Sequence, residues 1–191
     1  WGNSSGAIPS IRIYIQDGPG AGRDFYNLTK TGKKHTKLQS DIEIKNNLSL
    51  SGSGYIYPNN SGTNYDITIG GNWHQNRPNS FRALSGKVIF NGSSAQTINS
   101  RSNFYNLQIS NSDVSLLRAA TASGTLTIDS GAKLDINGNN LTAGTLANNG
   151  NLQLKGSETL SITTKDTDSG TITYDGTATG LKYGNTYYNL A

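Results

Sequence analysis

Short runs in which apolar and polar residues alternate recur along the whole chain. Leu126-Thr127-Ile128 and Leu152-Gln153-Leu154 are typical, with two aliphatic residues on either side of one polar residue. Residues i and i+2 of a β-strand face the same side, so each run predicts a short strand with two inward aliphatic side chains. No stretch holds a helical period beyond about two turns. The pattern therefore predicts an all-β protein.

The apolar positions also return at a fixed interval of about 26 residues. We expect the members of five pairs to stack on each other in the core: Leu126 with Leu152, Ile128 with Leu154, Leu134 with Leu160, Ile136 with Ile162, and Leu146 with Ile172. Stacked coils explain such an interval, whereas an antiparallel sandwich, which short strands also suggest, does not. Turns rich in Gly and Asn separate the runs and suit tight corners. We therefore predict a right-handed parallel β-solenoid (β-helix) of about seven coils of roughly 26 residues.

A longer repeat of about 80 residues overlies the short one. The tetrapeptides at 25–28, 104–107 and 187–190 each contain Tyr-Asn-Leu and follow one another at this longer interval. Three short periods account for most of the distance, so we expect residues 1–191 to form a single solenoid segment. Its repeat units lie at approximately 1–72, 73–150 and, incompletely, 151–191. The chain starts without a methionine or a signal sequence, which indicates a processed product or a segment of a longer protein.

Composition narrows the picture further. Only 33% of the residues are hydrophobic, but 10 tyrosines and many β-branched residues argue for thin stacked cores rather than disorder. With no cysteine, disulfides and thiolate catalysis are excluded. No apolar run approaches the roughly 20 residues that cross a bilayer, so we expect no membrane insertion. The net charge of +4 suits an anionic partner without identifying one.

Three segments, 64–73, 88–98 and 104–107, resemble the repeats of very large secreted bacterial surface proteins. Those proteins are often adhesin-like and form parallel β-helices, and the resemblance covers nearly the whole chain. It implies an extracellular or cell-surface location and a non-enzymatic structural or adhesive function without a cofactor. Because solenoid coils bury their apolar faces only against neighbours, we also expect continuation in a longer repeat chain or end-to-end self-association into a filament or sheath.

A polysaccharide-binding module is the first alternative. Aromatic side chains can stack on sugar rings, and basic side chains can hold an anionic polysaccharide. The candidate residues are Trp73, Tyr55, Tyr57, Lys30, Lys33, Lys34 and Lys37. No aromatic residue is interleaved in the lysine cluster, so we do not expect nucleic acid as a partner.

A polysaccharide lyase or hydrolase is the second alternative. It would depend on Asp113, Asp135 and Glu158, but the spacing of these carboxylates is shorter than the predicted coil and does not place them in one column. Asp166 and Asp168 resemble the start of a calcium loop, although Thr177 stands where such a loop needs a glutamate. We therefore expect no catalytic site and no metal, with Ca²⁺ at Asp166 and Asp168 as the one candidate.

Overall fold

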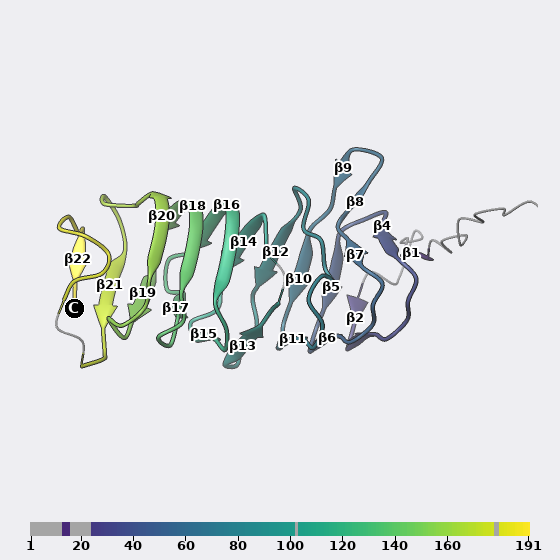
Figure 1. The fold of residues 1–191 in the computed structure, drawn as a ribbon, viewed down its shortest axis with the longest axis horizontal. Coiled ribbons are helices and arrows are strands. Elements are labelled where there is room, and N and C mark those ends of the chain that lie inside the picture. Colours follow the sequence, from purple (N-terminus) through teal and green to yellow (C-terminus); the bar gives the residue numbers. More distant parts are fainter. Residues whose placement is uncertain (1–12, 16–23, 102, 178–179) are drawn as a thin grey trace, which may run out of the picture.

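The chain winds as an elongated parallel β-solenoid of about eight turns (Figure 1). The computed structural model describes residues 13–15, 24–101, 103–177 and 180–191. All regular structure in these ranges is β-strand, and the strands of successive coils pair in parallel. The prediction of an all-β parallel solenoid is confirmed. Nowhere in these ranges is there a helix with the length and apolarity to cross a membrane.

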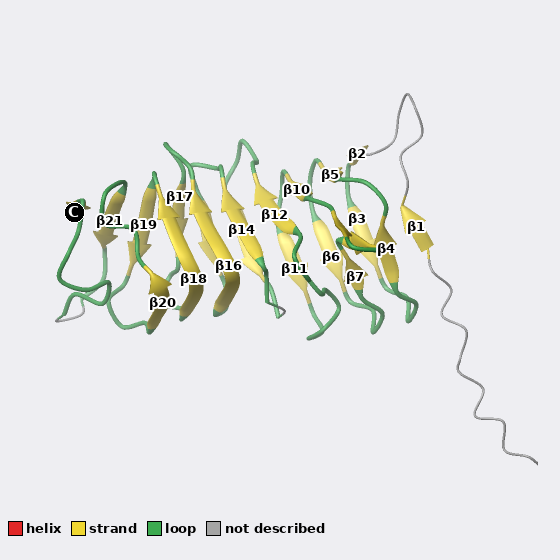
Figure 2. Ribbon diagram, turned by 90° about the horizontal axis from the view of Figure 1, so that it is seen from above, coloured by secondary structure: helices red, strands yellow, loops and turns green. Residues whose placement is uncertain are grey.

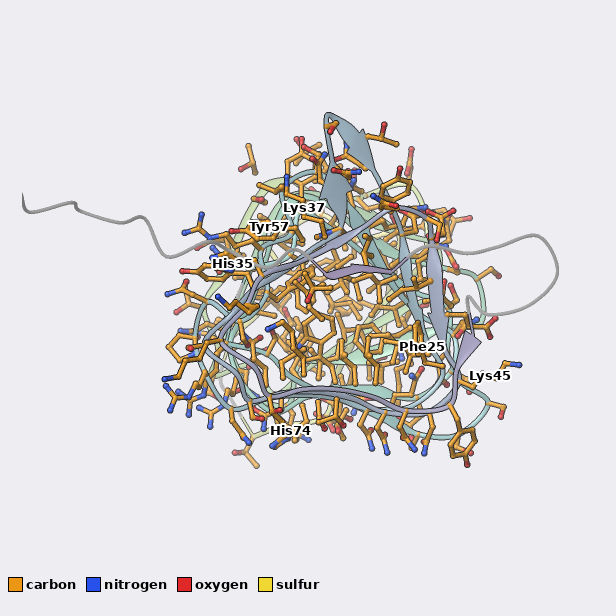
Figure 3. The ribbon with its side chains drawn as sticks, turned by 90° about the vertical axis from the view of Figure 1, so that its right-hand side faces the viewer. Phe25, His35, Lys37, Lys45, Tyr57 and His74 are labelled. Atoms are coloured by element: carbon orange, nitrogen blue, oxygen red, sulfur yellow. The ribbon has the colours of Figure 1, made fainter. Side chains whose placement is uncertain are left out.

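Three faces enclose one narrow core, as the end-on view in Figure 3 shows. Face 1 is a nine-stranded sheet of β3 (Leu28–Lys30), β6 (Leu48–Leu50), β11 (Trp73–Gln75), β13 (Gln96–Asn99), β15 (Val114–Leu116), β17 (Lys133–Asp135), β19 (Asn151–Leu154), β21 (Thr171–Tyr174) and β22 (Asn189–Leu190). Face 2 is an eight-stranded sheet of β2 (Asp24–Phe25), β5 (Ile42–Ile44), β10 (Ile67–Ile69), β12 (Lys87–Phe90), β14 (Asn106–Ile109), β16 (Ala120–Ile128), β18 (Leu141–Asn148) and β20 (Leu160–Thr164).

Face 3 is less regular than the other two. It starts with β1 (Ile13–Ile15), β4 (Thr36–Leu38) and β7 (Ile56–Tyr57). Single bridges at Phe81 and Phe104 continue it, and the first halves of β16, β18 and β20 complete it (Figure 2). A small antiparallel hairpin, β8 (Asn59–Asn60) with β9 (Thr63–Asn64), projects from the body after β7.

The coils are shorter than the interval between Leu126 and Leu152 suggested. Residues paired between neighbouring coils lie 18 to 25 positions apart in the chain. Leu126 on face 2 therefore lies beside Leu146, whereas Leu152 lies on face 1 beside Leu134. The predicted stacking is wrong for all five pairs, because the longer interval carries the chain through one coil and on to the next face.

The predicted core side chains nevertheless point inward. Nine of the ten are buried: Leu126, Ile128, Leu134, Ile136, Leu146, Leu152, Leu154, Ile162 and Ile172. Leu160 is partly buried and packs against them. The alternation of apolar and polar residues thus identified the inward positions correctly, independently of the coil length.

The longer repeat does not return the chain to the same face. Leu28 and Leu190 belong to face 1, whereas Leu107 belongs to face 2. The tyrosine that begins each Tyr-Asn-Leu unit does point outward, since Tyr26, Tyr105 and Tyr188 are all exposed. These tyrosines belong to distant coils and form no continuous column.

Asparagine side chains fix one corner of successive coils. The Asn27 Oδ1 atom accepts the backbone N–H of Asn47, whose own Oδ1 atom accepts the N–H of Asn72. The Asn72 Oδ1 atom in turn accepts the N–H of Thr97. Each bond satisfies a peptide group at a turn that no strand partner reaches. This ladder explains why asparagine precedes Leu28, Leu48 and Trp73.

Candidate functional site

Positive charge collects along the corner where the chain passes from face 1 to face 3. The loops of five successive coils cross this corner, with described residues 31–35, 51–55, 76–80, 100, 101 and 103, and 117–119, none of which is Asp or Glu. We call this surface the basic corner and define it by Lys33, Lys34, His35, Tyr55, Arg77, Arg101 and Arg118. Lys33 and the three arginines are exposed. Because each of three successive coils contributes one arginine, the cations form a row along the solenoid axis.

A buried glutamine positions two of these arginines. The Gln75 side chain is fully buried at the end of β11. Its Nε2 atom donates to the Arg77 carbonyl oxygen at 2.8 Å, and its Oε1 atom accepts the Arg101 backbone N–H at 3.0 Å. The same oxygen accepts the Ser100 hydroxyl at 3.0 Å. One amide therefore ties together the turns of two neighbouring coils and fixes the backbones from which the guanidinium groups extend.

Aromatic rings join the cations at the start of the corner. The rings of His35 and Tyr55 stack with centroids 4.6 Å apart and planes 14° apart. The Arg82 guanidinium, from the coil after Tyr55, lies over the tyrosine ring with its Cζ atom 4.6 Å from the ring centroid. A cation over an aromatic face is attracted by the ring quadrupole. His35, Tyr55 and Arg82 thus form a stack across three coils.

The two predicted groups of binding residues meet at this stack. Tyr57 pairs in register with Lys37, and its ring lies 5.7 Å from that of His35 (Figure 3). No aromatic residue is interleaved in the lysine cluster along the sequence, but in the structure two tyrosine rings from the next coil lie beside it. The expectation that nucleic acid is not a partner stays a prediction. Lys30 differs from the others: its Nζ atom donates to the carbonyl oxygens of Gly32 and Gly54, and burial lowers its pKa.

Trp73 is not a surface residue, which corrects its prediction as a sugar-stacking side chain. It is fully buried and packs edge-to-face against Phe81 and Phe104, with centroid distances of 4.9 Å and 5.2 Å. Its register partners on face 1 are Leu48 and Ile98, which are themselves buried core residues. Its environment is therefore that of a core residue.

The three carboxylates considered for catalysis do not form a column. The Asp113 carboxylate pairs with the Lys133 ammonium at 3.0 Å. Asp135 lies one coil further on face 1, opposite Ser115. Glu158 is buried in the turn before β20, and neither of its side-chain oxygens has a partner among the described residues.

The calcium candidate has the geometry of a turn. The Asp166 carboxylate accepts the backbone N–H groups of Asn148, Asp168 and Ser169 and the Ser169 hydroxyl. Burial opposes the ionised form, but these hydrogen bonds prevail and lower the pKa of Asp166. Within the described ranges, no three His, Asp or Glu side chains gather closely enough to hold a metal ion.

Sequence reasoning missed the arginines of the basic corner. Arg77, Arg101 and Arg118 are unevenly spaced along the chain, so no search at one fixed interval connects them. The signal was present, because each arginine comes shortly after the end of a face 1 strand.

Comparisons of the chain with protein-family models, with curated proteins and with solved structures returned no match. The functional argument therefore depends on the geometry of the chain itself.

Proposed function

We propose that this chain is a non-enzymatic extracellular segment of a bacterial surface protein that binds an acidic polysaccharide along its basic corner. The row of cations in loops without Asp or Glu is the observation that carries the proposal. The solenoid serves as a rigid scaffold, because the strands of face 1 and of face 2 pair continuously from coil to coil, from β3 to β22 and from β2 to β20.

The spacing of the corner suits a linear polymer. Neighbouring coils lie about 4.8 Å apart, so the four coils from His35 to Arg101 extend over about 14 Å. A negatively charged chain laid along the axis would meet a cation or an aromatic ring at each step. Charges along such a surface concentrate and orient an oppositely charged partner, and added salt screens the attraction.

Three other lysines on the outside of the solenoid make a contrast. Lys87, Lys133 and Lys155 are paired with Asp66, Asp113 and Asp175, at 3.7, 3.0 and 2.6 Å. Their charges are locally balanced, whereas the corner arginines have no acidic neighbour in their loops. Location at the cell surface and end-to-end association stay predictions from the sequence.

The test compares two triple variants of equal charge for binding to alginate, a polymer of uronic acids, with dextran as the neutral polymer. Arg77→Ala/Arg101→Ala/Arg118→Ala is expected to weaken alginate binding roughly tenfold, since three exposed contacts of about 0.5 kcal/mol each amount to about 1.5 kcal/mol. Lys87→Ala/Lys133→Ala/Lys155→Ala is the matched control and should bind almost as the wild type does.

Calorimetry or surface plasmon resonance provides the affinities. Equal losses of alginate affinity in both triple variants would show that binding depends only on the net charge of the protein, which would overturn the proposal. Wild-type binding to dextran as tight as to alginate would also overturn it. Equal binding to single-stranded DNA would show that the corner selects charge rather than polysaccharide, which contradicts the proposal as stated.

A further inference from the structure

The hydrogen-bonded ladder of face 3 is interrupted between Phe81 and Phe104. Phe81 is bridged to Ile56 in the coil before it, and Phe104 is bridged to Ala122 in the coil after it. Among the described residues, no backbone hydrogen bond joins the segments 79–84 and 103–105. On the other two faces the same two coils pair directly, through β11 with β13 and β12 with β14. The interruption is therefore local to face 3.

Peptide groups face this gap without a strand partner. In a parallel ladder, one residue uses both its N–H and its C=O toward the same neighbouring strand. Ile56 does this toward the Phe81 coil, with its N–H donating to Ser80 and its C=O accepting from Arg82. The N–H and C=O of Phe81 point the opposite way, toward the Phe104 coil. Among the described residues, no backbone group bonds to either of them, so both can bind a ligand that enters between the coils.

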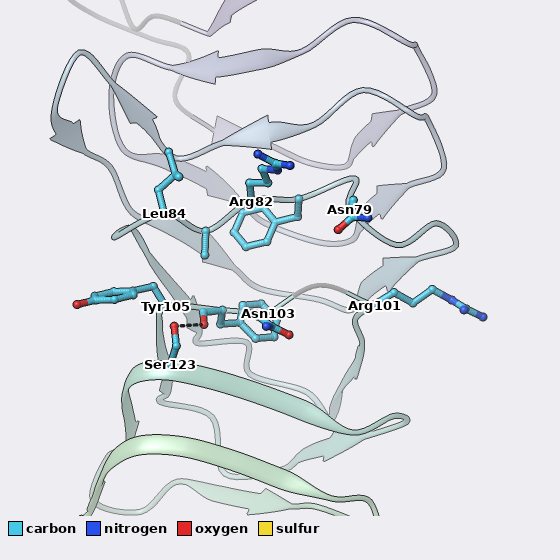
Figure 4. A pocket seen from close by; sticks show the side chains of 10 residues that line it. Asn79, Arg82, Leu84, Arg101, Asn103, Tyr105 and Ser123 are labelled. Atoms are coloured by element: carbon cyan, nitrogen blue, oxygen red, sulfur yellow. Dashed lines mark hydrogen bonds between the residues drawn. The ribbon is translucent and has the colours of Figure 1, made fainter. Parts of the chain in front are cut away.

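A cavity of about 330 Å³ occupies the gap (Figure 4). Phe81, Ala83 and Phe104 are buried residues that line it, while Arg101 and Tyr105 extend from its two ends in Figure 4. This volume is at the small end of the range for ligand pockets, roughly 300–1,000 Å³. It suits one sugar ring better than an oligosaccharide.

The aromatic core holds the cavity open. Phe81 and Phe104 both pack against Trp73, and their own ring centroids lie 6.0 Å apart at an angle of 48°. Large rings in close contact resist further approach of the two coils. The cavity is thus preformed and does not depend on a ligand to open it.

Backbone strain marks the same place. Asn79 and Leu84 line the cavity and have φ angles of 61° and 50°. Asparagine tolerates this left-handed region, but leucine adopts it only at an energetic cost. Such strain persists where the surroundings enforce it and is concentrated at binding and catalytic sites. Leu84 is also 49% exposed, so its strained position leaves an apolar side chain at the rim.

The charges around the cavity are all positive. Arg82 and Arg101 belong to the lining, which contains no Asp or Glu. Neither arginine forms an ion pair with a described residue. Arg101 also belongs to the basic corner, so the cavity opens beside the row of cations.

We propose that this cavity binds a single sugar ring that carries a carboxylate, a uronic acid residue. The inference rests on the proposed function, in that the ring belongs to the polymer on the basic corner. Arg101 pairs with the carboxylate, in the two-pronged geometry that guanidinium groups favour. The peptide groups of Phe81 bind the hydroxyls, and the buried side chains of Ala83 and Phe104 contact the apolar side of the ring.

Titration of the ¹⁵N-labelled protein with D-glucuronate tests the proposal by NMR. The amide signals of Phe81 and Tyr105 are expected to shift and to saturate, whereas D-glucose should leave them at least tenfold less responsive. Asn103→Trp fills the rim of the cavity and should abolish the shifts. Asn149→Trp, at an exposed position on another corner, should leave them as in the wild type.

Shifts that survive Asn103→Trp, or a wild-type protein whose Phe81 and Tyr105 signals do not respond, would overturn the inference. Alginate binding is measured on the same samples and separates the two proposals. Alginate binding without any glucuronate response refutes the cavity but leaves the basic corner. A glucuronate response without alginate binding supports the cavity and refutes the function proposed for the corner.

Discussion

Gln75 in one coil accepts a hydrogen bond from the backbone of Arg101 in the next, with 3.0 Å between the Gln75 Oε1 and Arg101 N atoms. The glutamine amide is fully buried, and the arginine side chain that it positions lies at the surface. This link connects the packing of the core to the arrangement of charge on the basic corner.

Replacing this amide should affect stability and binding together. Gln75→Leu leaves the Arg77 carbonyl and the Arg101 N–H without their partner. A buried polar group without a hydrogen bond costs roughly 1–3 kcal/mol, so we expect a loss of that size in the free energy of unfolding. Alginate affinity should also fall, because the two turns are released. Urea unfolding and calorimetry measure the two effects.

Gln96 provides the matched control at a different corner. It is also buried, and its amide bonds to the Ile69 carbonyl and the Gly92 N–H where the chain passes from face 2 to face 1. Gln96→Leu should lose similar stability but keep its affinity for alginate under conditions where it is folded. Equal loss of affinity in both variants would argue against a specific role of Gln75.

Trp73 should prove to be a stability residue and not a binding residue. Trp73→Ala empties a large volume between Phe81 and Phe104, and such changes cost about 3–5 kcal/mol. His74→Ala, at the exposed next position, should change the free energy of unfolding by no more than about 0.5 kcal/mol. A Trp73→Ala protein of normal stability would contradict the core packing described above.

Gly70 should tolerate no side chain. A Cβ atom at this position would lie 2.4 Å from the Lys45 carbonyl oxygen of the preceding coil. Gly70→Ala therefore forces neighbouring coils apart and should destabilise the protein by about 1–3 kcal/mol in urea unfolding. Gly180→Ala is the control, because nothing lies within 4 Å of the added atom. Similar stabilities for the two variants would show that Gly70 does not pack closely against the backbone of Lys45 in the preceding coil.

Alkaline pH should destabilise the last described coil through Tyr183. Burial, reinforced by the charge of Asp166, raises the pKa of Tyr183 to about 12, against about 10 for an unfolded tyrosine. Because the folded state holds this proton more tightly, the stabilisation is complete below about pH 10 and is lost as the pH rises toward about 12. Tyr183→Phe should therefore lose stability less steeply over that range.

Urea midpoints at about pH 9 and pH 11 measure this effect. Tyr183→Phe also removes the hydroxyl that donates to the Asp166 carbonyl, so its midpoint at the lower pH should be below that of the wild type. Tyr188→Phe, at a tyrosine that is 62% exposed, should follow the wild-type pH dependence. An identical pH dependence in Tyr183→Phe and the wild type would contradict this assignment.

The fold was predictable from the sequence because the alternation of apolar and polar residues reports directly which side chains point inward. The coil length was not, because all three faces carry similar aliphatic doublets. Leu126 has two equivalent-looking partners, Leu146 in the same sheet and Leu152 in another sheet. Only the hydrogen-bond register separates the two.

The candidate site was predictable only in part. Tyr55, Tyr57 and the lysines were identified by residue type, and the structure brings the two tyrosines together beside His35, with Lys37 in register with Tyr57. The contribution of Arg77 and Arg101 depends on turns from different coils that meet at one corner. No local sequence motif shows that these turns meet, and a prediction with the wrong coil length places them at different corners.

The central claim is that coils of about 20 residues stack in register, since the basic corner exists only if they do. The chain has no cysteine, so pairs of cysteines can be introduced cleanly. Thr127 and Ala147 are register partners on the outside of face 2, at a separation that fits a disulfide. Oxidation of Thr127→Cys/Ala147→Cys followed by mass spectrometry should show a disulfide, and Thr127→Cys/Gln153→Cys should stay reduced. A disulfide in the second pair but not in the first would contradict the account.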